Sequence, residues 1–107
     1  MKYRIILSPD AKAGVSSAFR WYERTDSDVA IRFLLRTNAT INRIRLNPYS
    51  FPRVRGVIRR AVLRRFPYSI FFGLSKQTIT VMAIRHQRQS DIFGMARDID
   101  MLSEEPE

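Results

Sequence analysis

Apolar residues recur with two different periods along this chain, and the change of period falls near residue 57. Before that point they return every three or four positions, as they do on one face of an α-helix. Beyond it, runs of β-branched and aromatic residues are typical of strands. The pattern therefore predicts a helical first half and a β-rich second half.

Two amphipathic helices are predicted in the first half, after a short apolar strand at residues 3–7. Ser8 as N-cap and Pro9 at the first helical position begin the first helix. The second begins at Asp26 or Ser27 and ends before Pro48. We expect two apolar stripes to enter the core: Ala11, Val15, Ala18, Phe19 and Tyr22 from the first helix, and Ala30, Phe33, Leu34, Thr37, Ile41 and Ile44 from the second.

The connector at residues 47–56 holds two prolines and a glycine, which predict a turn without regular structure. Three strands then follow at residues 57–63, 68–74 and 77–86. The joints between them are too short for a crossover helix, so the strands are predicted to pair antiparallel. Strict alternation in the third strand places Thr78, Thr80, Met82 and Ile84 on one face and Ile79, Val81 and Ala83 on the other.

The fold class predicted from this order is α+β: an N-terminal strand, a helical hairpin and a three-stranded antiparallel meander, with the helices packed on one face of the sheet. The other face is expected to have no cover from the chain itself. Residues 1–97 form the single predicted domain, within the usual size for one core. A short helix is predicted at residues 90–102, and the acidic segment at 98–107 is expected to be flexible.

The net charge of +9 is distributed unevenly along the chain. Residues 1–97 carry 19 basic against five acidic side chains, a net of +14, while five acids and no base follow. Sixteen of the 19 bases are arginines, whose planar fork suits phosphate and carboxylate groups. Such a charge attracts nucleic acids and acidic protein segments alike, so the composition leaves both partners open.

Several classes of chemistry have little support in the composition. The chain has no cysteine, one histidine and few carboxylates, so we expect neither disulfides, a metal site nor another cofactor. Asp10 follows the first apolar run at once, which excludes a signal peptide. The most apolar stretch, residues 68–74, is far shorter than the ~20 residues that span a bilayer. A cytoplasmic protein without a membrane partner is therefore expected.

Five segments carry a resemblance to a known superfamily. They are "YRIILSPDA", "FRWYER", "NPYSFPRV", "IRRAVLRRFPYSIFF" and "ITVMAIRHQRQSDIF", which together cover about residues 3–93. In this order they resemble the RelE/ParE superfamily of toxins from bacterial type II toxin–antitoxin systems. The resemblance implies a cytoplasmic toxin that arrests growth, or stabilises a plasmid, and that is neutralised by a cognate acidic antitoxin encoded nearby.

The two branches of this superfamily differ in mechanism. RelE-like members cleave mRNA on the ribosome without metal, whereas characterised ParE-like members inhibit DNA gyrase by binding. RelE-like sequences commonly have an arginine after the tyrosine of the strand that corresponds to residues 68–74, and a tyrosine or histidine near the C-terminus. Here Ser69 follows Tyr68, and Phe93 stands near the C-terminus. These departures favour the ParE-like branch and a non-enzymatic inhibitor of gyrase, with a ribosome-dependent mRNA endonuclease as the alternative.

The candidate site residues follow from the same comparison. If the protein is a nuclease, the catalytic candidates are Arg65, His86 and Arg88, because histidine titrates in the useful pH range. The residues predicted to bind antitoxin or target are Arg53, Arg55, Arg59, Arg60, Arg64, Arg65, Tyr68, His86 and Arg88. A third alternative, a non-toxic basic RNA-binding module, requires exposed aromatics for stacking, with Phe66, Tyr68, Phe71 and Phe72 as candidates.

Overall fold

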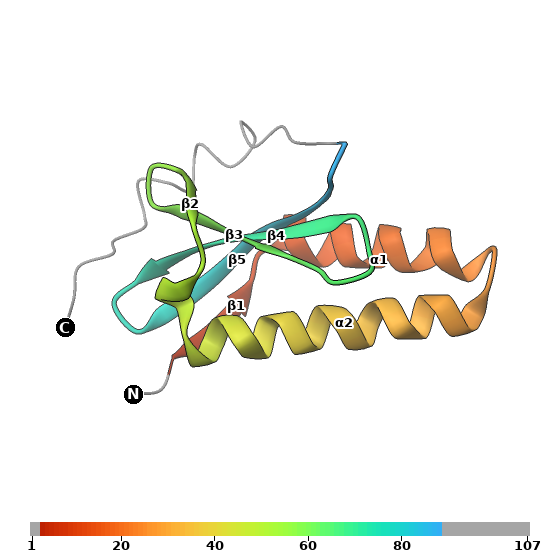
Figure 1. The fold of residues 1–107 in the computed structure, drawn as a ribbon, viewed down its shortest axis with the longest axis horizontal. Coiled ribbons are helices and arrows are strands. Elements are labelled where there is room, and N and C mark those ends of the chain that lie inside the picture. The colour runs from red at the N-terminus through yellow and green to blue at the C-terminus, as the bar shows by residue number, and fades with distance from the viewer. Residues whose placement is uncertain (1–2, 89–107) are drawn as a thin grey trace.

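A five-stranded mixed sheet and a helical hairpin make up the computed structural model, which describes residues 3–88 (Figure 1). The predicted helix at 90–102, the acidic segment at 98–107 and Phe93 lie outside these residues. The elements are β1 (Arg4–Leu7), α1 (Pro9–Glu23), α2 (Ser27–Leu46), the 3₁₀ helix η1 (Pro48–Ser50), β2 (Arg53–Arg55), β3 (Ile58–Val62), β4 (Tyr68–Ser75) and β5 (Thr78–His86). No helix among residues 3–88 is both long and apolar enough to cross a membrane.

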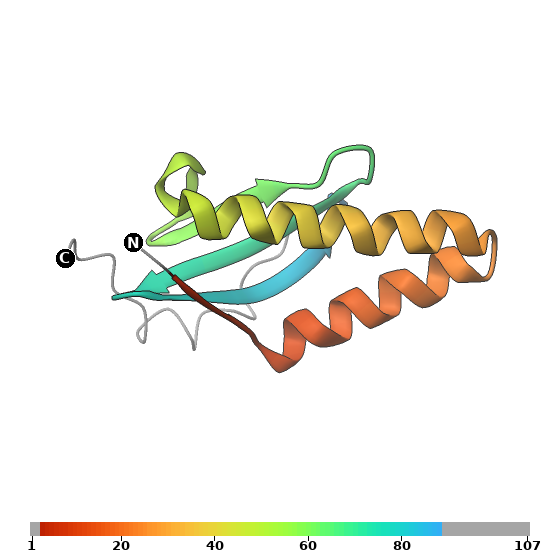
Figure 2. The ribbon, with the colours of Figure 1, turned by 90° about the horizontal axis from the view of Figure 1, so that it is seen from below.

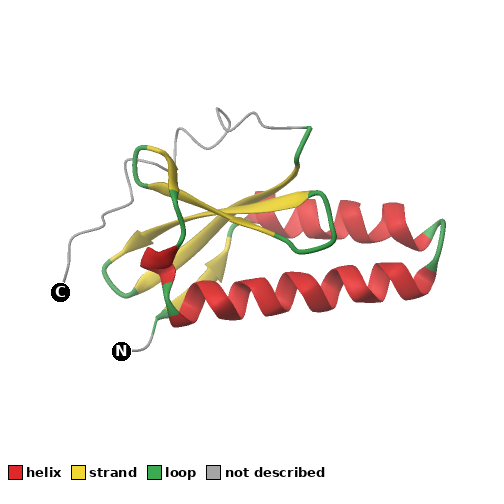
Figure 3. Cartoon of the chain, viewed as in Figure 1, coloured by secondary structure: helices red, strands yellow, loops and turns green. Residues whose placement is uncertain are grey.

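The predicted α+β class is confirmed (Figure 3), and the strand order is β1-β5-β4-β3-β2. β3, β4 and β5 form the predicted antiparallel meander, and β1 pairs in parallel with β5. The expectation of an irregular connector is wrong, because residues 47–56 contain η1 and β2. Gly56 has φ +54°, a left-handed conformation that glycine adopts freely and that turns β2 back onto β3.

The helical hairpin lies on one side of the sheet, and its tip projects beyond the end of the sheet (Figure 2). Ser8 caps α1 as predicted and accepts a hydrogen bond from the Ala11 N–H at 3.0 Å. Asp26 caps α2 through the Asp28 N–H at 2.9 Å. The residues of both predicted stripes are buried or half-buried, so the periodicity had assigned their inward faces correctly.

The main core lies between the hairpin and the sheet, where Phe33 and Ile44 of α2 belong to the same cluster as Phe72 and Leu74 of β4. A second, smaller cluster occupies the opposite face of the sheet and consists of Ile58, Phe71, Met82 and Ala83. All four side chains are buried. The prediction of an uncovered second face is therefore wrong at the centre of that face.

A β-bulge at Met82 changes which residues of β5 face the hairpin. Phe72 pairs with Val81 and Phe71 pairs with Ala83, so Met82 has no direct partner on β4. Val81 and Ile84 both join the main core although they are three residues apart. The predicted alternation, which placed Ile84 on the face of Met82, fails beyond the bulge.

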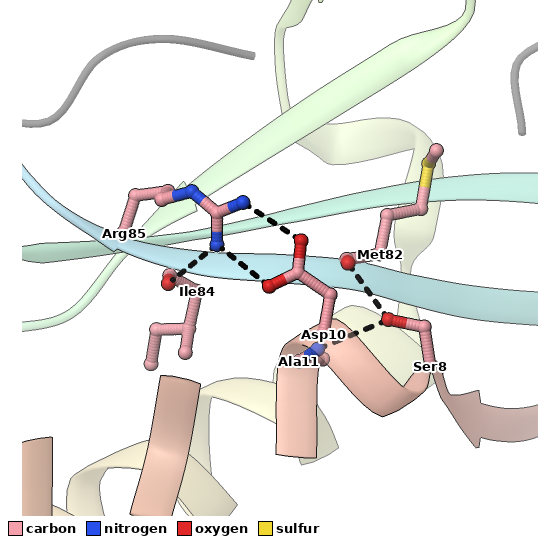
Figure 4. Close-up of polar contacts among 6 residues, drawn as sticks. All are labelled: Ser8, Asp10, Ala11, Met82, Ile84 and Arg85. Atoms are coloured by element: carbon pink, nitrogen blue, oxygen red, sulfur yellow. Dashed lines mark hydrogen bonds and ion pairs between the residues drawn. The ribbon is translucent and has the colours of Figure 1, made fainter. Parts of the chain in front are cut away.

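The start of α1 takes the place of β1 along the edge of β5. The Ser8 N–H donates to the Val81 carbonyl at 2.9 Å, and its hydroxyl donates to the Met82 carbonyl at 2.7 Å (Figure 4). Further along α1, Gly14 lies so close to β5 that a Cβ there would be 2.6 Å from Ile84 Cγ2 and 3.0 Å from the Ile84 carbonyl oxygen. The helix can approach this edge because residue 14 has no side chain.

We predict that Gly14→Ala destabilises the protein. Alanine favours a helix over glycine by about 1 kcal/mol, but overpacking against the branched Ile84 side chain and its backbone costs typically ~1–3 kcal/mol. Urea unfolding should show a net loss of stability. Ser17→Ala, at an exposed position of the same helix, is the control and should be neutral or slightly stabilising. A Gly14→Ala protein as stable as this control would contradict the prediction.

Candidate functional site

Two turns meet at the end of the sheet that lies beside the last turn of α1. One joins β3 to β4, and the other follows β5. They are linked by a hydrogen bond of 2.7 Å from the Gln87 N–H to the Pro67 carbonyl. Arg64 and Arg65 are exposed on the first turn and Arg88 is exposed on the second. The pairing of β3, β4 and β5 thus brings three cations to one end of the molecule.

Tyr68 and His86 lie side by side behind these turns, because they are paired residues of β4 and β5. Their rings meet edge to face with centroids 5.1 Å apart. The Arg88 N–H donates to His86 Nδ1 at 3.1 Å. A ring nitrogen that accepts a hydrogen bond carries no proton, so in the neutral ring Nε2 carries the proton and can donate a hydrogen bond to a ligand.

His86 borders two hollows, one on each side of β5. The first has a volume of about 520 Å³ and is lined by Trp21, Tyr22, Pro67, Tyr68 and His86. The second has a volume of about 290 Å³ and is lined by Arg60, Val62, Ser69, Phe71, Arg85, His86 and Gln87. We call the first the aromatic hollow. The second, in which two arginines and other polar side chains lie beside Val62 and Phe71, is called the polar hollow.

The two tyrosines of the aromatic hollow remain protonated over a wider pH range than free tyrosine. Burial raises the pKa of Tyr68. Burial, followed by the neighbouring Tyr68, raises the pKa of Tyr22. Both hydroxyls are therefore neutral hydrogen-bonding groups near pH 7, and neither is suited to act as a base.

Arg85, which the sequence analysis did not select, is held by an ion pair with Asp10. The guanidinium makes two hydrogen bonds to the carboxylate, at 2.7 and 3.1 Å (Figure 4). The two residues are 75 positions apart, so no local pattern connects them. This pairing offsets a positive charge in the polar hollow and ties β5 to the first turn of α1.

The other predicted arginines do not share one surface. Arg60, Arg64, Arg65 and Arg88 lie around the two hollows or on the turns beside them. Arg53 and Arg55 belong to β2, which pairs with the opposite end of β3. The structure therefore divides the predicted set into two groups.

Arg59 departs from the expectation of an exposed cation. It is buried, its Nη1 donates to the Phe51 carbonyl at 2.6 Å, and its guanidinium lies 5.3 Å from the centre of the Tyr49 ring. These contacts join β3 to the connector that precedes β2. Arg59 accordingly contributes to the fold rather than to an exposed binding surface.

Two of the four aromatics proposed for RNA stacking are unavailable, whereas Phe66 and Tyr68 are half-buried. Phe71 and Phe72 are buried on opposite faces of β4. Trp21, by contrast, is 56% exposed at the mouth of the aromatic hollow, and the sequence analysis did not select it. Its position one residue outside the apolar stripe of α1 was the available signal. No cluster of His, Cys, Asp and Glu suited to a metal ion occurs within residues 3–88.

Comparisons with known proteins give one family match and one match of fold. The family model described as the ParE toxin of the type II toxin–antitoxin system, parDE, matches residues 5–91. A solved structure titled as the chromosomal ParDE toxin–antitoxin system from P. aeruginosa matches with a TM-score of 0.71. At 15% identity, and with 79% of this chain and 96% of that chain covered, this match concerns the fold alone. No curated protein sequence matches the chain.

We predict that the raised pKa of Tyr68 makes stability fall in alkaline solution. A phenol with a higher pKa in the folded state keeps its proton longer there than in the unfolded chain, so folding is disfavoured as the pH rises above the ordinary value of 10.0. Tyr68→Phe should lose less stability than the parent protein between about pH 9 and pH 11. Urea unfolding across this range measures the difference. An equal decrease of the free energy of unfolding with pH in both proteins would contradict the raised pKa of Tyr68.

Proposed function

Because the chain belongs to the ParE toxin family of type II toxin–antitoxin systems, and is thus a toxin component with a cognate antitoxin, we propose that it arrests growth by binding DNA gyrase. The proposed action is inhibition without chemistry of its own. Its proposed toxin domain comprises residues 1–97, and an acidic segment follows at residues 98–107. Its place of action is the cytoplasm, where both gyrase and the ribosome are found.

Ser69 is the observation that most favours inhibition over RNA cleavage. RelE-like nucleases commonly have an arginine at this point of the strand that corresponds to β4. In this protein the residue is a buried serine in the polar hollow, paired across the sheet with Arg85. Arg85 is in turn bound to Asp10. A phosphate at this point would meet a short hydroxyl and an arginine that already has a carboxylate partner.

Acid–base chemistry also has few contributors at this end of the sheet. Cleavage through a 2′-hydroxyl requires one group to remove a proton and another to supply one. Tyr68 is a poor base because burial raises its pKa. Of the two ring nitrogens of His86, Nδ1 already accepts the Arg88 N–H. The geometry thus supports an inhibitor that acts by binding.

The nuclease alternative keeps one favourable observation. His86 borders both hollows, and Arg65 and Arg88 lie on the two turns that meet beside it. In that mechanism His86 would transfer the proton and the arginines would stabilise the phosphate. This is the same set that the sequence predicted for a nuclease.

The proposed antitoxin is an acidic protein encoded beside the toxin, with an amphipathic arm. α1 and α2 together line a groove of about 250 Å³, formed by Val15, Ser16, Phe19, Arg20 and Leu34. Two further apolar side chains of α2, Ile31 and Leu35, are more than half exposed. An arm with apolar and acidic residues would cover such a surface and pair with its arginines.

We predict that association with this antitoxin slows as salt rises. Exposed charges steer the encounter, and salt screens them over about 8–10 Å at moderate ionic strength. Arg60→Gln and Arg64→Gln should lower the association rate at low salt more than Lys76→Gln, which removes the same charge at the opposite end of β4. Stopped-flow mixing measures these rates. Rates independent of salt would show that the arginines do not steer binding.

We predict that induction of the toxin alone arrests bacterial growth and that the neighbouring gene relieves the arrest. Arrested cells should show a DNA-damage response and impaired supercoiling while their transcripts remain intact. Purified toxin should inhibit supercoiling by purified gyrase. The matched comparison is His86→Ala, which should weaken the arrest only in part, because in a binding mechanism it removes one contact of a larger surface and no proton transfer.

Mapping of transcript ends after induction tests the alternative. Cuts at codons occupied by ribosomes, reduced about a hundredfold or more in rate by His86→Ala, would overturn inhibition of gyrase in favour of RNA cleavage. Normal growth at confirmed expression of the folded protein would count against toxicity itself.

A further inference from the structure

The aromatic hollow has a composition that the toxin assignment does not explain. Trp21 is the sole tryptophan of the chain, and 56% of its surface is open to solvent. It meets Tyr22 edge to face at 5.1 Å. Tyr22 in turn packs against Tyr68, which contacts His86. Four rings from α1, β4 and β5 therefore border one space of about 520 Å³, within the ~300–1,000 Å³ usual for small-ligand sites.

Three arginines lie on the two turns that adjoin this space. Pro67 belongs to its lining and to the turn that carries Arg64 and Arg65. The Gln87–Pro67 hydrogen bond holds the turn that carries Arg88 beside it. All three arginines are exposed. At the end of α1, the exposed Glu23 lies between two further exposed arginines, Arg20 and Arg24, so positive charge prevails there too.

Three kinds of ligand suit aromatic walls: a cation, an apolar side chain and a nucleobase. The arginines of the rim disfavour a cation. An apolar side chain would leave the polar groups of Tyr22, Tyr68 and His86 without partners, which carries a desolvation cost. A base offers a flat face for the rings, polar edges for the hydroxyls and the imidazole, and a phosphate on each side for the arginines. Of the three ligands, only a base with its phosphates matches both the aromatic side chains and the neighbouring arginines.

We propose that the aromatic hollow, formed by Trp21, Tyr22, Pro67, Tyr68 and His86, binds an unpaired base of single-stranded DNA. Arg64, Arg65 and Arg88 bind the adjoining phosphates. The aromatic walls and the arginine rim carry the argument for a nucleic acid, whereas the choice of DNA over RNA rests on the proposed action at gyrase. Neither gyrase nor growth enters the experiment, so the two proposals can fail separately.

The fluorescence of Trp21 can report binding at this site directly, because the chain has no other tryptophan. Oligothymidine of about ten nucleotides, a length within the range that single-strand binders cover, should quench its fluorescence with a saturable curve. Trp21→Ala should weaken binding of a dye-labelled oligothymidine by about tenfold or more, since stacking contributes ~1–3 kcal/mol per base. Trp21→Phe should retain most of the affinity. Leu35→Ala, at an exposed apolar site on α2, should retain all of it.

A second pair of variants tests the rim. Arg65 and Lys76 both occupy left-handed turn positions, with φ of 69° and 55°, so Arg65→Gln and Lys76→Gln remove one charge from similar backbones at opposite ends of β4. Arg65→Gln should reduce the dependence of log affinity on log salt by about 0.7 if one phosphate contact is lost. Lys76→Gln should leave that dependence unchanged.

Several outcomes would overturn the proposal. An abasic strand or polyglutamate that quenches Trp21 as strongly as oligothymidine would show that charge alone is recognised. Unchanged affinity in a folded Trp21→Ala protein would exclude stacking on this ring. Tighter binding of oligouridine than of oligothymidine would replace DNA by RNA. Circular dichroism of each variant confirms that it is folded before its affinity is compared.

Discussion

The docking of α1 against the bulged half of β5 is the contact on which the rest of the structure depends. β1 ends at Leu7, and from Ser8 onward the edge of β5 is bordered by a helix instead of a strand. The Ser8 hydroxyl caps the helix and binds the Met82 carbonyl at the bulge, so one side chain satisfies polar groups of both elements. The close approach at Gly14 and the ion pair between Asp10 and Arg85 then fix the direction of α1 along β5.

The position of the candidate site follows from this direction. Because α1 runs along β5, its last turn reaches the end of the sheet and brings Trp21 and Tyr22 to Tyr68 and His86. The bulge moves Ile84 into the main core and keeps His86 in register with Tyr68. A shift of one residue in this pairing would move His86 to the other face of β5. The aromatic hollow therefore depends on a contact at the opposite end of α1.

The arginines of this protein serve different purposes that their number alone does not reveal. Arg59 is an internal hydrogen-bond donor that anchors the connector, and Arg85 is bound to a carboxylate. Arg43 lies 5.4 Å from the centre of the Phe51 ring. Arg60, Arg64, Arg65 and Arg88 are exposed in or beside the two hollows, where their positive charge attracts a polyanion. Placement thus decides the role of each arginine.

The sequence by itself determined the helices, the meander, the caps and the superfamily, because each rests on local periodicity, on a capping side chain or on a contiguous motif. Through the resemblance it also selected Tyr68, His86, Arg65 and Arg88 among its candidate binding residues, and the pairing of β4 with β5 places Tyr68 beside His86. Only the tertiary structure decided the bulge at Met82, the partner of Arg85, the burial of Arg59 and the exposure of Trp21. Each of these depends on contacts between residues far apart in the chain, whose register and spacing no local pattern encodes.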